Sequence, residues 1–180
     1  MAVVVETIYK VGNFTFNNQK DADKFDTYLN VLDDKQLKEL YYGYESKSKI
    51  DYTIYAKPEF SWKQMREIRM GLQQKLDVSI YAKPEFNDGQ MNEIRFGLLK
   101  EIDVSWYAKT KFTWQQMSII RAGLEQGLDV SWYAKPEFDY FQMSEIRSGL
   151  EYRLDVSTYA DPNLSWKEMK EKKLNLKNKD

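Results

Sequence analysis

The chain has 180 residues, 42% of them hydrophobic and 15% aromatic, and its 27 basic and 28 acidic side chains nearly cancel. This balance argues against binding driven by a basic surface, and equally against an acidic mimic of nucleic acid. The chain has no cysteine and no histidine, which excludes zinc sites built from these ligands, thiol nucleophiles, disulfides and histidine-based triads. No signal peptide or membrane span is recognisable, so we expect a cytoplasmic protein with no membrane contact.

Residues 1–31 differ from the rest of the chain. The stretch "AVVVETIYKV", a Gly-Asn pair and "FTF" are typical of two strands joined by a tight turn. A helix with Ala22, Phe25, Leu29 and Leu32 on one face is expected to follow. Because a lone hairpin is marginally stable in water, it should pack on the segment that follows or pair with another chain through its edge.

Residues 55–158 are four copies of a 26-residue repeat, and residues 32–54 are a degenerate first copy with two extra residues in "ESKSK". A fixed period of about 20–50 residues is typical of a stacked array, in which each copy buries its apolar side against the next. Residues 159–180 begin another copy, but the Ile-Arg pair of the helix has become Lys172-Lys173. This polar substitution is expected of a capping repeat, followed by a basic tail.

Each copy predicts a longer helix with a well-marked start. An N-cap residue precedes a glutamine or glutamate by three places, and an apolar residue and a methionine flank the cap, which are the capping-box and hydrophobic-staple patterns. The pairs are Ser61–Gln64, Asn87–Gln90, Thr113–Gln116, Asp139–Gln142 and Ser165–Glu168, with Asp33–Gln36 in the degenerate copy. The expected buried stripe of the first full copy is Met65, Ile68, Leu72 and Leu76.

The segment between these helices, such as "DVSIYAKP", has two interpretations. Its valine, isoleucine and tyrosine favour a strand, as in a leucine-rich-repeat-like array. However, Val78, Tyr81 and Ala82 stay constant at helical spacing while position 80 varies, although a strand would place Val78 and Ile80 on one face. We therefore expect a short helix, capped by aspartate and ended before proline. The predicted fold is mainly α, an α-solenoid of short helix pairs with a small N-terminal β-hairpin plus helix.

A glycine recurs inside the longer helix at Gly71, Gly97, Gly123 and Gly149. Glycine in a helix interior costs about 1 kcal/mol relative to alanine, so its recurrence needs a reason. These glycines lie beside the buried stripe, and we expect a neighbouring helix to come close there. At the helix end, Gly127 is the expected left-handed terminator of one copy.

An arginine ladder, Arg69, Arg95, Arg121 and Arg147, recurs at one position of the helix. Its members could contact phosphate groups, or they could form ion pairs between repeats, for which arginine is well suited. The net charge of the four full copies alternates in sign, so no basic stripe accumulates. We therefore favour the structural interpretation.

Large side chains at positions that differ between copies are the candidate partner-binding residues. In a stacked array the framework positions stay fixed and the displayed face can vary, and exposed aromatics are frequent hot spots of interfaces. Filling of gaps between repeats is the alternative. The candidates are Ile80, Phe96, Trp106, Trp114, Trp132, Tyr140 and Phe141.

The repeat words "YAKPEF", "QM.EIR.GL" and "LDVS.YA" resemble repeats in uncharacterised proteins of Gram-positive gut bacteria, their phages and mobile elements, over about residues 55–165. The resemblance implies a bacterial setting and, by analogy, a binder that modulates a host enzyme. No glycine-rich phosphate loop, nucleophile elbow or metal-ligand spacing is present, so no catalytic or cofactor-binding residue is predicted. We expect a non-enzymatic scaffold or inhibitor of a protein partner; the alternatives are nucleic-acid binding through the arginine ladder and basic tail, and self-assembly through the N-terminal strand.

Overall fold

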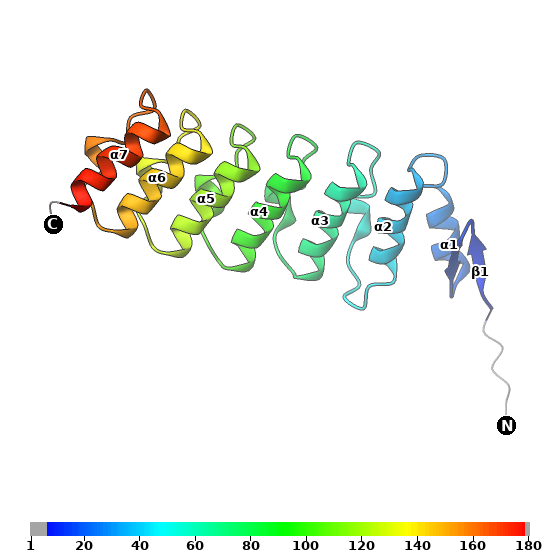
Figure 1. Ribbon diagram of the computed structural model, residues 1–180. Coiled ribbons are helices and arrows are strands. Elements are labelled where there is room, and N and C mark those ends of the chain that lie inside the picture. The colour runs from blue at the N-terminus through cyan, green and yellow to red at the C-terminus, as the bar shows by residue number, and fades with distance from the viewer. Residues whose placement is uncertain (1–6, 179–180) are drawn as a thin grey trace. The chain divides into compact units, whose positions relative to one another are not determined.

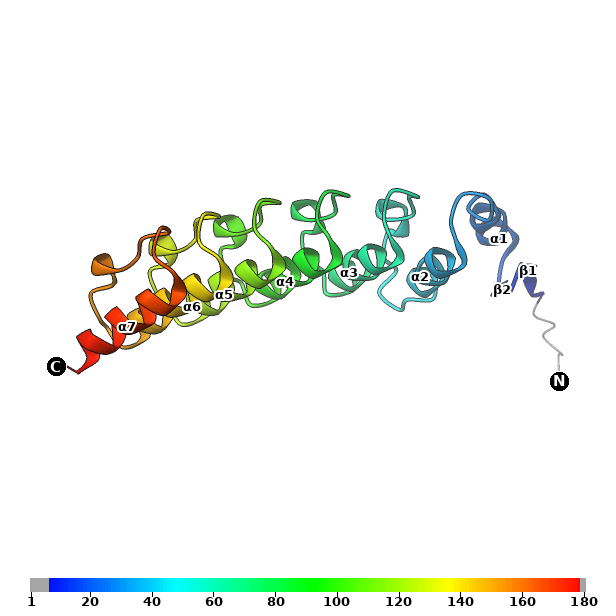
Figure 2. The same cartoon turned by 45° about the horizontal axis from the view of Figure 1, so that its top comes forward.

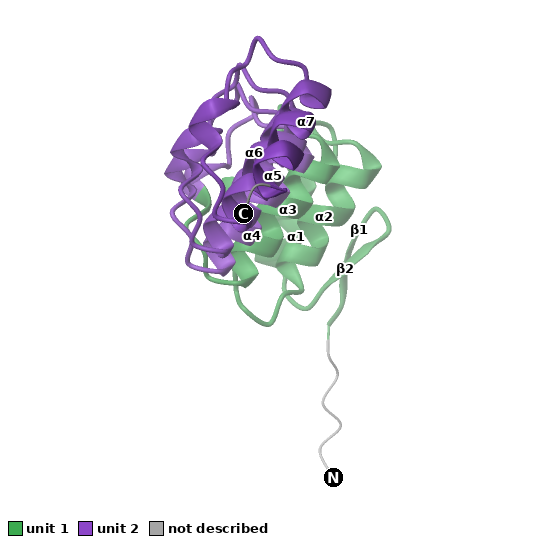
Figure 3. Ribbon diagram, turned by 60° about the vertical axis from the view of Figure 1, so that its left-hand side comes forward, with its two compact units in different colours: residues 1–78 green, residues 79–180 purple. Residues whose placement is uncertain are grey.

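The computed structural model describes residues 7–178, and the chain divides into two compact units, residues 1–78 and residues 79–180 (Figure 3). The part of the predicted first strand that precedes residue 7 lies outside the described residues. The predicted fold class is confirmed, because the molecule is mainly helical, has one small hairpin, and repeats the same helix packing within each unit.

Unit 1 begins with an antiparallel hairpin in which Gly12 adopts the left-handed conformation at the turn (φ +56°). Its elements are β1 (Tyr9–Val11), β2 (Phe14–Phe16), α1 (Gln19–Asp26), α2 (Asp34–Tyr44), the single 3-10 turn η1 (Tyr52–Ile54) and α3 (Trp62–Gln73). Helix α1 packs on both strands, and α2 packs on α3. The first helix is shorter than predicted, since Leu29 and Leu32 lie in the turns that follow it.

Aromatic rings hold the hairpin on the first repeat. Phe16 lies 5.0 Å from Phe25 of α1 and 4.9 Å from Tyr44 of α2, measured between ring centroids. The hydroxyl of Tyr41 donates a hydrogen bond of 3.0 Å to the carbonyl oxygen of Thr15. Phe16 and Phe25 are almost fully buried, so the expectation that the hairpin packs on the repeats is confirmed.

Unit 2 contains α4 (Asp88–Leu99), η3 (Val104–Trp106), α5 (Trp114–Glu125), η4 (Val130–Trp132), α6 (Tyr140–Glu151), η5 (Val156–Thr158) and α7 (Trp166–Lys177), and η2 (Val78–Ile80) lies at the junction of the units. Helices α4 to α7 lie side by side in one row, and the 3-10 turns form a second row beside them (Figures 1 and 2). The predicted short helix is thus one 3-10 turn. Asp103 caps it in the third copy, where its side chain accepts a bond from the backbone N–H of Ser105.

The predicted capping boxes are present in α2 to α7. At the other end, Gly127 has a left-handed conformation (φ +69°), as predicted. The equivalent residues Lys75, Glu101 and Arg153 adopt the same conformation (φ +57° to +61°) in spite of their side chains. Every full copy therefore turns the same corner.

The glutamine of the capping box has a second role that joins one repeat to the next. While Oε1 of Gln116 accepts a bond from the N-cap N–H, Nε2 donates a bond of 2.6 Å to the carbonyl oxygen of Phe138 in the following copy. Gln36, Gln90 and Gln142 make the same bond, to Phe60, Phe112 and Leu164. All four side chains are buried, so each amide satisfies a carbonyl that has little access to water.

The repeated glycine has a different cause from the one predicted. A Cβ atom on Gly97, Gly123 or Gly149 would lie 1.7–1.9 Å from the hydroxyl oxygen of the tyrosine that follows the next 3-10 turn and opens the following copy: Tyr107, Tyr133 and Tyr159 respectively. The close neighbour is therefore a ring that folds back from the 3-10 turn, and not an adjacent helix. In α7, after which no repeat tyrosine follows among the described residues, this position is Asn175.

Gln116→Glu separates the two roles of the glutamine. A capping role alone predicts a small gain in stability, because a carboxylate is favourable near a helix N-terminus. We expect instead a loss of about 1–3 kcal/mol in the free energy of unfolding, since the donor to Phe138 disappears. Chemical denaturation measures it. The control is Glu168→Gln, a box residue with no repeat carbonyl to join; an equal effect in both variants would contradict the inter-repeat role.

Gly123→Ala should destabilise the protein by about 1–3 kcal/mol, because the new methyl group collides with Tyr133. Adding Tyr133→Phe should recover much of that loss, since it removes the nearest atom. Tyr133→Phe alone should have little effect on stability, because its hydroxyl has no hydrogen-bond partner. The hydroxyl of Tyr107 donates to the carbonyl oxygen of Glu93 at 3.2 Å, so Tyr107→Phe should lower the free energy of unfolding by about 1 kcal/mol. Thermal unfolding of the two single variants at 123 and 133, of their double variant and of Tyr107→Phe measures these changes. If the loss in the double variant equals the sum of the losses in Gly123→Ala and Tyr133→Phe, the collision is refuted.

Candidate functional site

Two arginines of the ladder, Arg69 and Arg121, form ion pairs between adjacent helices. Nε of Arg69 donates to Oε2 of Glu39 at 2.9 Å, and Nε of Arg121 donates to Oε2 of Glu93 at 2.8 Å. Burial opposes the charge of Arg121, but the interactions with Glu93 and Glu125 together outweigh it and raise the pKa of the guanidinium. Arg95 is 2% exposed. These side chains are held in the stack, which supports the structural interpretation.

One arginine of the ladder, Arg147, has no glutamate on the preceding helix at the position that pairs with Arg121 in the copy before it. The position of Glu93 is occupied by Ile119 in the next copy, and the following Arg147 has a buried Nε with no hydrogen-bond partner. Its Nη1 instead reaches Glu151 at 3.1 Å on its own helix and Gln126 at 3.3 Å. The junction between α5 and α6 is thus the one in unit 2 where the guanidinium is not matched by a carboxylate across the helices.

The structure divides the seven candidate partner-binding residues among three positions of the repeat. Ile80, Trp106 and Trp132 end the 3-10 turns η2, η3 and η4; Phe96 lies in the middle of α4; Trp114, Tyr140 and Phe141 lie in the first turn of α5 or α6. The two tryptophans of the turns are 38% and 36% exposed. The candidates therefore belong to three separate parts of the repeat, and their role in binding a partner stays a prediction.

Phe96 is partly structural. Its ring lies 4.6 Å from the guanidinium carbon of Arg95 and 5.9 Å from that of Arg121, and it is 37% exposed. Tyr42 holds Arg69 in the same way, at 5.5 Å. The aromatic ring at this position thus covers the charged group of the ladder.

The first turns of α5, α6 and α7 carry aromatic side chains at equivalent or adjacent positions, which we call the aromatic edge: Trp114, Tyr140, Phe141 and Trp166. The rings of Tyr140 and Phe141 lie 5.4 Å apart, and Phe141 lies 5.9 Å from Trp166 of the next helix. Trp114 rests on Gly89, where a Cβ atom would approach its ring to 3.0 Å. Trp166 was not among the candidates, although it occupies the same first helical position as Trp114 and Tyr140.

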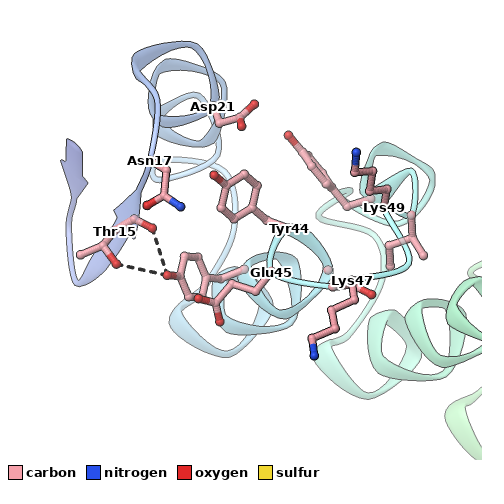
Figure 4. A pocket seen from close by; sticks show the side chains of 12 residues that line it. Thr15, Asn17, Asp21, Tyr44, Glu45, Lys47 and Lys49 are labelled. Carbon is pink, nitrogen blue, oxygen red and sulfur yellow. Dashed lines mark hydrogen bonds between the residues drawn. The ribbon is translucent and has the colours of Figure 1, made fainter. Parts of the chain in front are cut away.

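Unit 1 contains a polar cleft of about 620 Å³ beside the two-residue insertion (Figure 4). Asn17 and Asp21 come from the hairpin side, Tyr44 comes from the end of α2, and Lys47 and Lys49 come from the inserted segment. Burial, and then the negative charge of Asp21, raise the pKa of the Tyr44 hydroxyl, which therefore stays protonated. The cleft combines hydrogen-bonding groups with charges of both signs.

Comparison with protein-family models, with curated proteins and with solved structures gives no match for this chain. The resemblance to the gut-bacterial repeat family therefore stays a prediction. Across residues 7–178, no helix has the length and apolar character needed to cross a bilayer. The same residues contain no group of three or more acidic side chains placed to hold a metal ion.

Replacing Arg121 and Arg147 by methionine compares a complete rung with the incomplete one. Arg121→Met leaves the carboxylate of Glu93 buried without its partner and should lower the free energy of unfolding by about 3 kcal/mol. Arg147→Met removes an unsatisfied donor and should be neutral or slightly stabilising. Urea denaturation measures both, and equal losses would show that the two rungs are equivalent.

Proposed function

We propose that the protein is a non-enzymatic repeat scaffold that binds a partner protein through the aromatic edge of unit 2. The observation that carries the proposal is a contrast between positions. The repeated tyrosines Tyr107 and Tyr133 are 0% exposed, whereas Trp114 and Phe141, at positions that differ between copies, are 47% and 56% exposed. The stack accounts for the constant residues and leaves the variable aromatics available for recognition.

The aromatic edge has the chemistry of an interface hot spot. Tryptophan and tyrosine dominate the binding energy of many interfaces, because a rigid ring buries a large area at a small cost in entropy. Phe141 lies between Tyr140 and Trp166, so the rings support one another. A contiguous exposed apolar group of this kind is more typical of a binding site than of ordinary surface.

The proposed mechanism is steric occupation of a partner's surface, without chemistry. Together with the resemblance of the repeat, this suggests a cytoplasmic product of a phage or mobile element that inhibits a host protein. The nucleic-acid alternative has weaker support, because Arg69 and Arg121 already bind glutamates inside the stack. The self-assembly alternative predicts a mass that rises with concentration in light scattering.

The double variant Tyr140→Ser, Phe141→Ser tests the assignment. The full chain is cross-linked to its partners in extract of the native host, each candidate is purified, and its affinity is measured directly. We expect the variant to bind at least 10-fold more weakly at unchanged helicity, which corresponds to about 1.4 kcal/mol.

The matched control is Trp106→Ser, Trp132→Ser, which removes two exposed aromatics from the 3-10 turns. It should alter the affinity less than 3-fold. A larger effect of the control pair would move the binding surface to the turns, and the absence of any protein that binds the purified chain would refute the proposed function.

A further inference from the structure

The cleft of unit 1 departs from the repeat in ways that stacking does not require. Tyr44 stands where the later copies have Leu72, Leu98, Leu124 and Leu150, and Tyr52 stands where they have Val78, Val104, Val130 and Val156. Both tyrosines line the cleft, next to the two-residue insertion. Two apolar framework positions have thus become aromatic hydroxyls, and the added length opens the space between them.

The charges of the cleft lie on different sides. Asp21 reaches into it from α1, and Lys49 comes from the inserted segment on the side away from Asp21 (Figure 4). No ion pair joins Asp21 to either lining lysine, Lys47 or Lys49, among the bonds of the described residues; the Asp21 carboxylate accepts a bond of 2.7 Å from Asn18 and also interacts with the hydroxyl of Tyr44. A ligand with separated charges of opposite sign would complement these two walls.

The wall near α1 is already suited to an ammonium group. Nζ of Lys24 lies 4.7 Å from the centroid of the Tyr52 ring, which shows that this ring accepts a cation from the chain itself. A carboxylate beside aromatic rings is a common arrangement for binding a primary ammonium. Asp21 and Tyr44 provide both elements on the same side of the cleft.

We propose that this cleft binds a short zwitterionic peptide, with its terminal ammonium at Asp21 and Tyr44 and its terminal carboxylate at Lys49. The cleft has about 620 Å³, within the range of pockets that hold drug-sized ligands and more than a single amino acid fills. The site lies in unit 1 and does not depend on the aromatic edge. The proposal therefore stands or falls independently of the proposed function.

The test is an NMR titration of the full-length 15N-labelled chain with trialanine. Two probes of nearly equal size separate the charges: N-acetyl-trialanine lacks the ammonium, and trialanine amide lacks the carboxylate. We expect trialanine to shift the amide signals of residues 15–52, and each blocked peptide to bind at least 10-fold more weakly. Absence of shifts at millimolar trialanine, or equal binding of either blocked peptide, would overturn the proposal.

Variants locate the two ends of the peptide. Asp21→Asn and Lys49→Gln should each weaken trialanine at least 5-fold, and each should remove the penalty for blocking its own end only. Tyr44→Phe keeps the ring against Phe16 and should weaken binding by a smaller factor. Asp26→Asn and Lys20→Gln, exposed charges of the same unit outside the cleft, are the controls and should leave the affinity unchanged; equal loss in the controls would refute specific recognition.

Discussion

The stack depends on a buried glutamine amide that bonds in two directions. At the start of α2, α4, α5 and α6, Gln36, Gln90, Gln116 and Gln142 cap their own helix through Oε1 and bind the carbonyl of the next copy through Nε2. A carbonyl buried without a donor would cost a large part of the stability of one copy. Because the bond joins fixed points of consecutive copies, it sets the register in which the next helix begins, and the ion pairs and apolar contacts form within that register.

A second constraint fixes the first tyrosine of each copy on the helix of the copy before it. The tyrosine after the 3-10 turn lies over the glycine of the long helix that precedes that turn, and the hydroxyls of Tyr55, Tyr107 and Tyr159 donate to a carbonyl of that helix. Burial raises the pKa of these hydroxyls, so they remain neutral donors. Beside the helix that contains Ile119, the hydroxyl of Tyr133 and Nε of Arg147 have no hydrogen-bond partner. The isoleucine at the position of Glu93 therefore coincides with two buried donors that have no partner.

The sequence was sufficient to predict the features that depend on residues close together in the chain. Helix starts, the left-handed corner at Gly127 and the short helical turn follow from residues within a few positions of each other. The contact between Gly123 and Tyr133 could not be predicted in this way. Tyr133 is ten residues away, and its ring reaches the glycine only because of the path of the intervening turn, which the sequence pattern does not predict. The bond from Gln116 was missed because glutamine and glutamate are equivalent in a capping box. The aromatic edge could be predicted only in part, since the exposure of Trp114 depends on the missing side chain of Gly89 in the preceding copy.

The turn after each long helix is a place where a copy can be longer without a change in how its other residues pack. In the degenerate copy two residues are added at this corner, yet Lys49 retains the left-handed conformation (φ +46°), Asp51 still caps the next turn, and Tyr55 is as completely covered as its later counterparts. The two added residues are thus accommodated within the turn, and the residues that follow it, Asp51 and Tyr55, keep their roles. A corner of this kind accommodates added residues while the capping aspartate and the covered tyrosine that follow it keep their places.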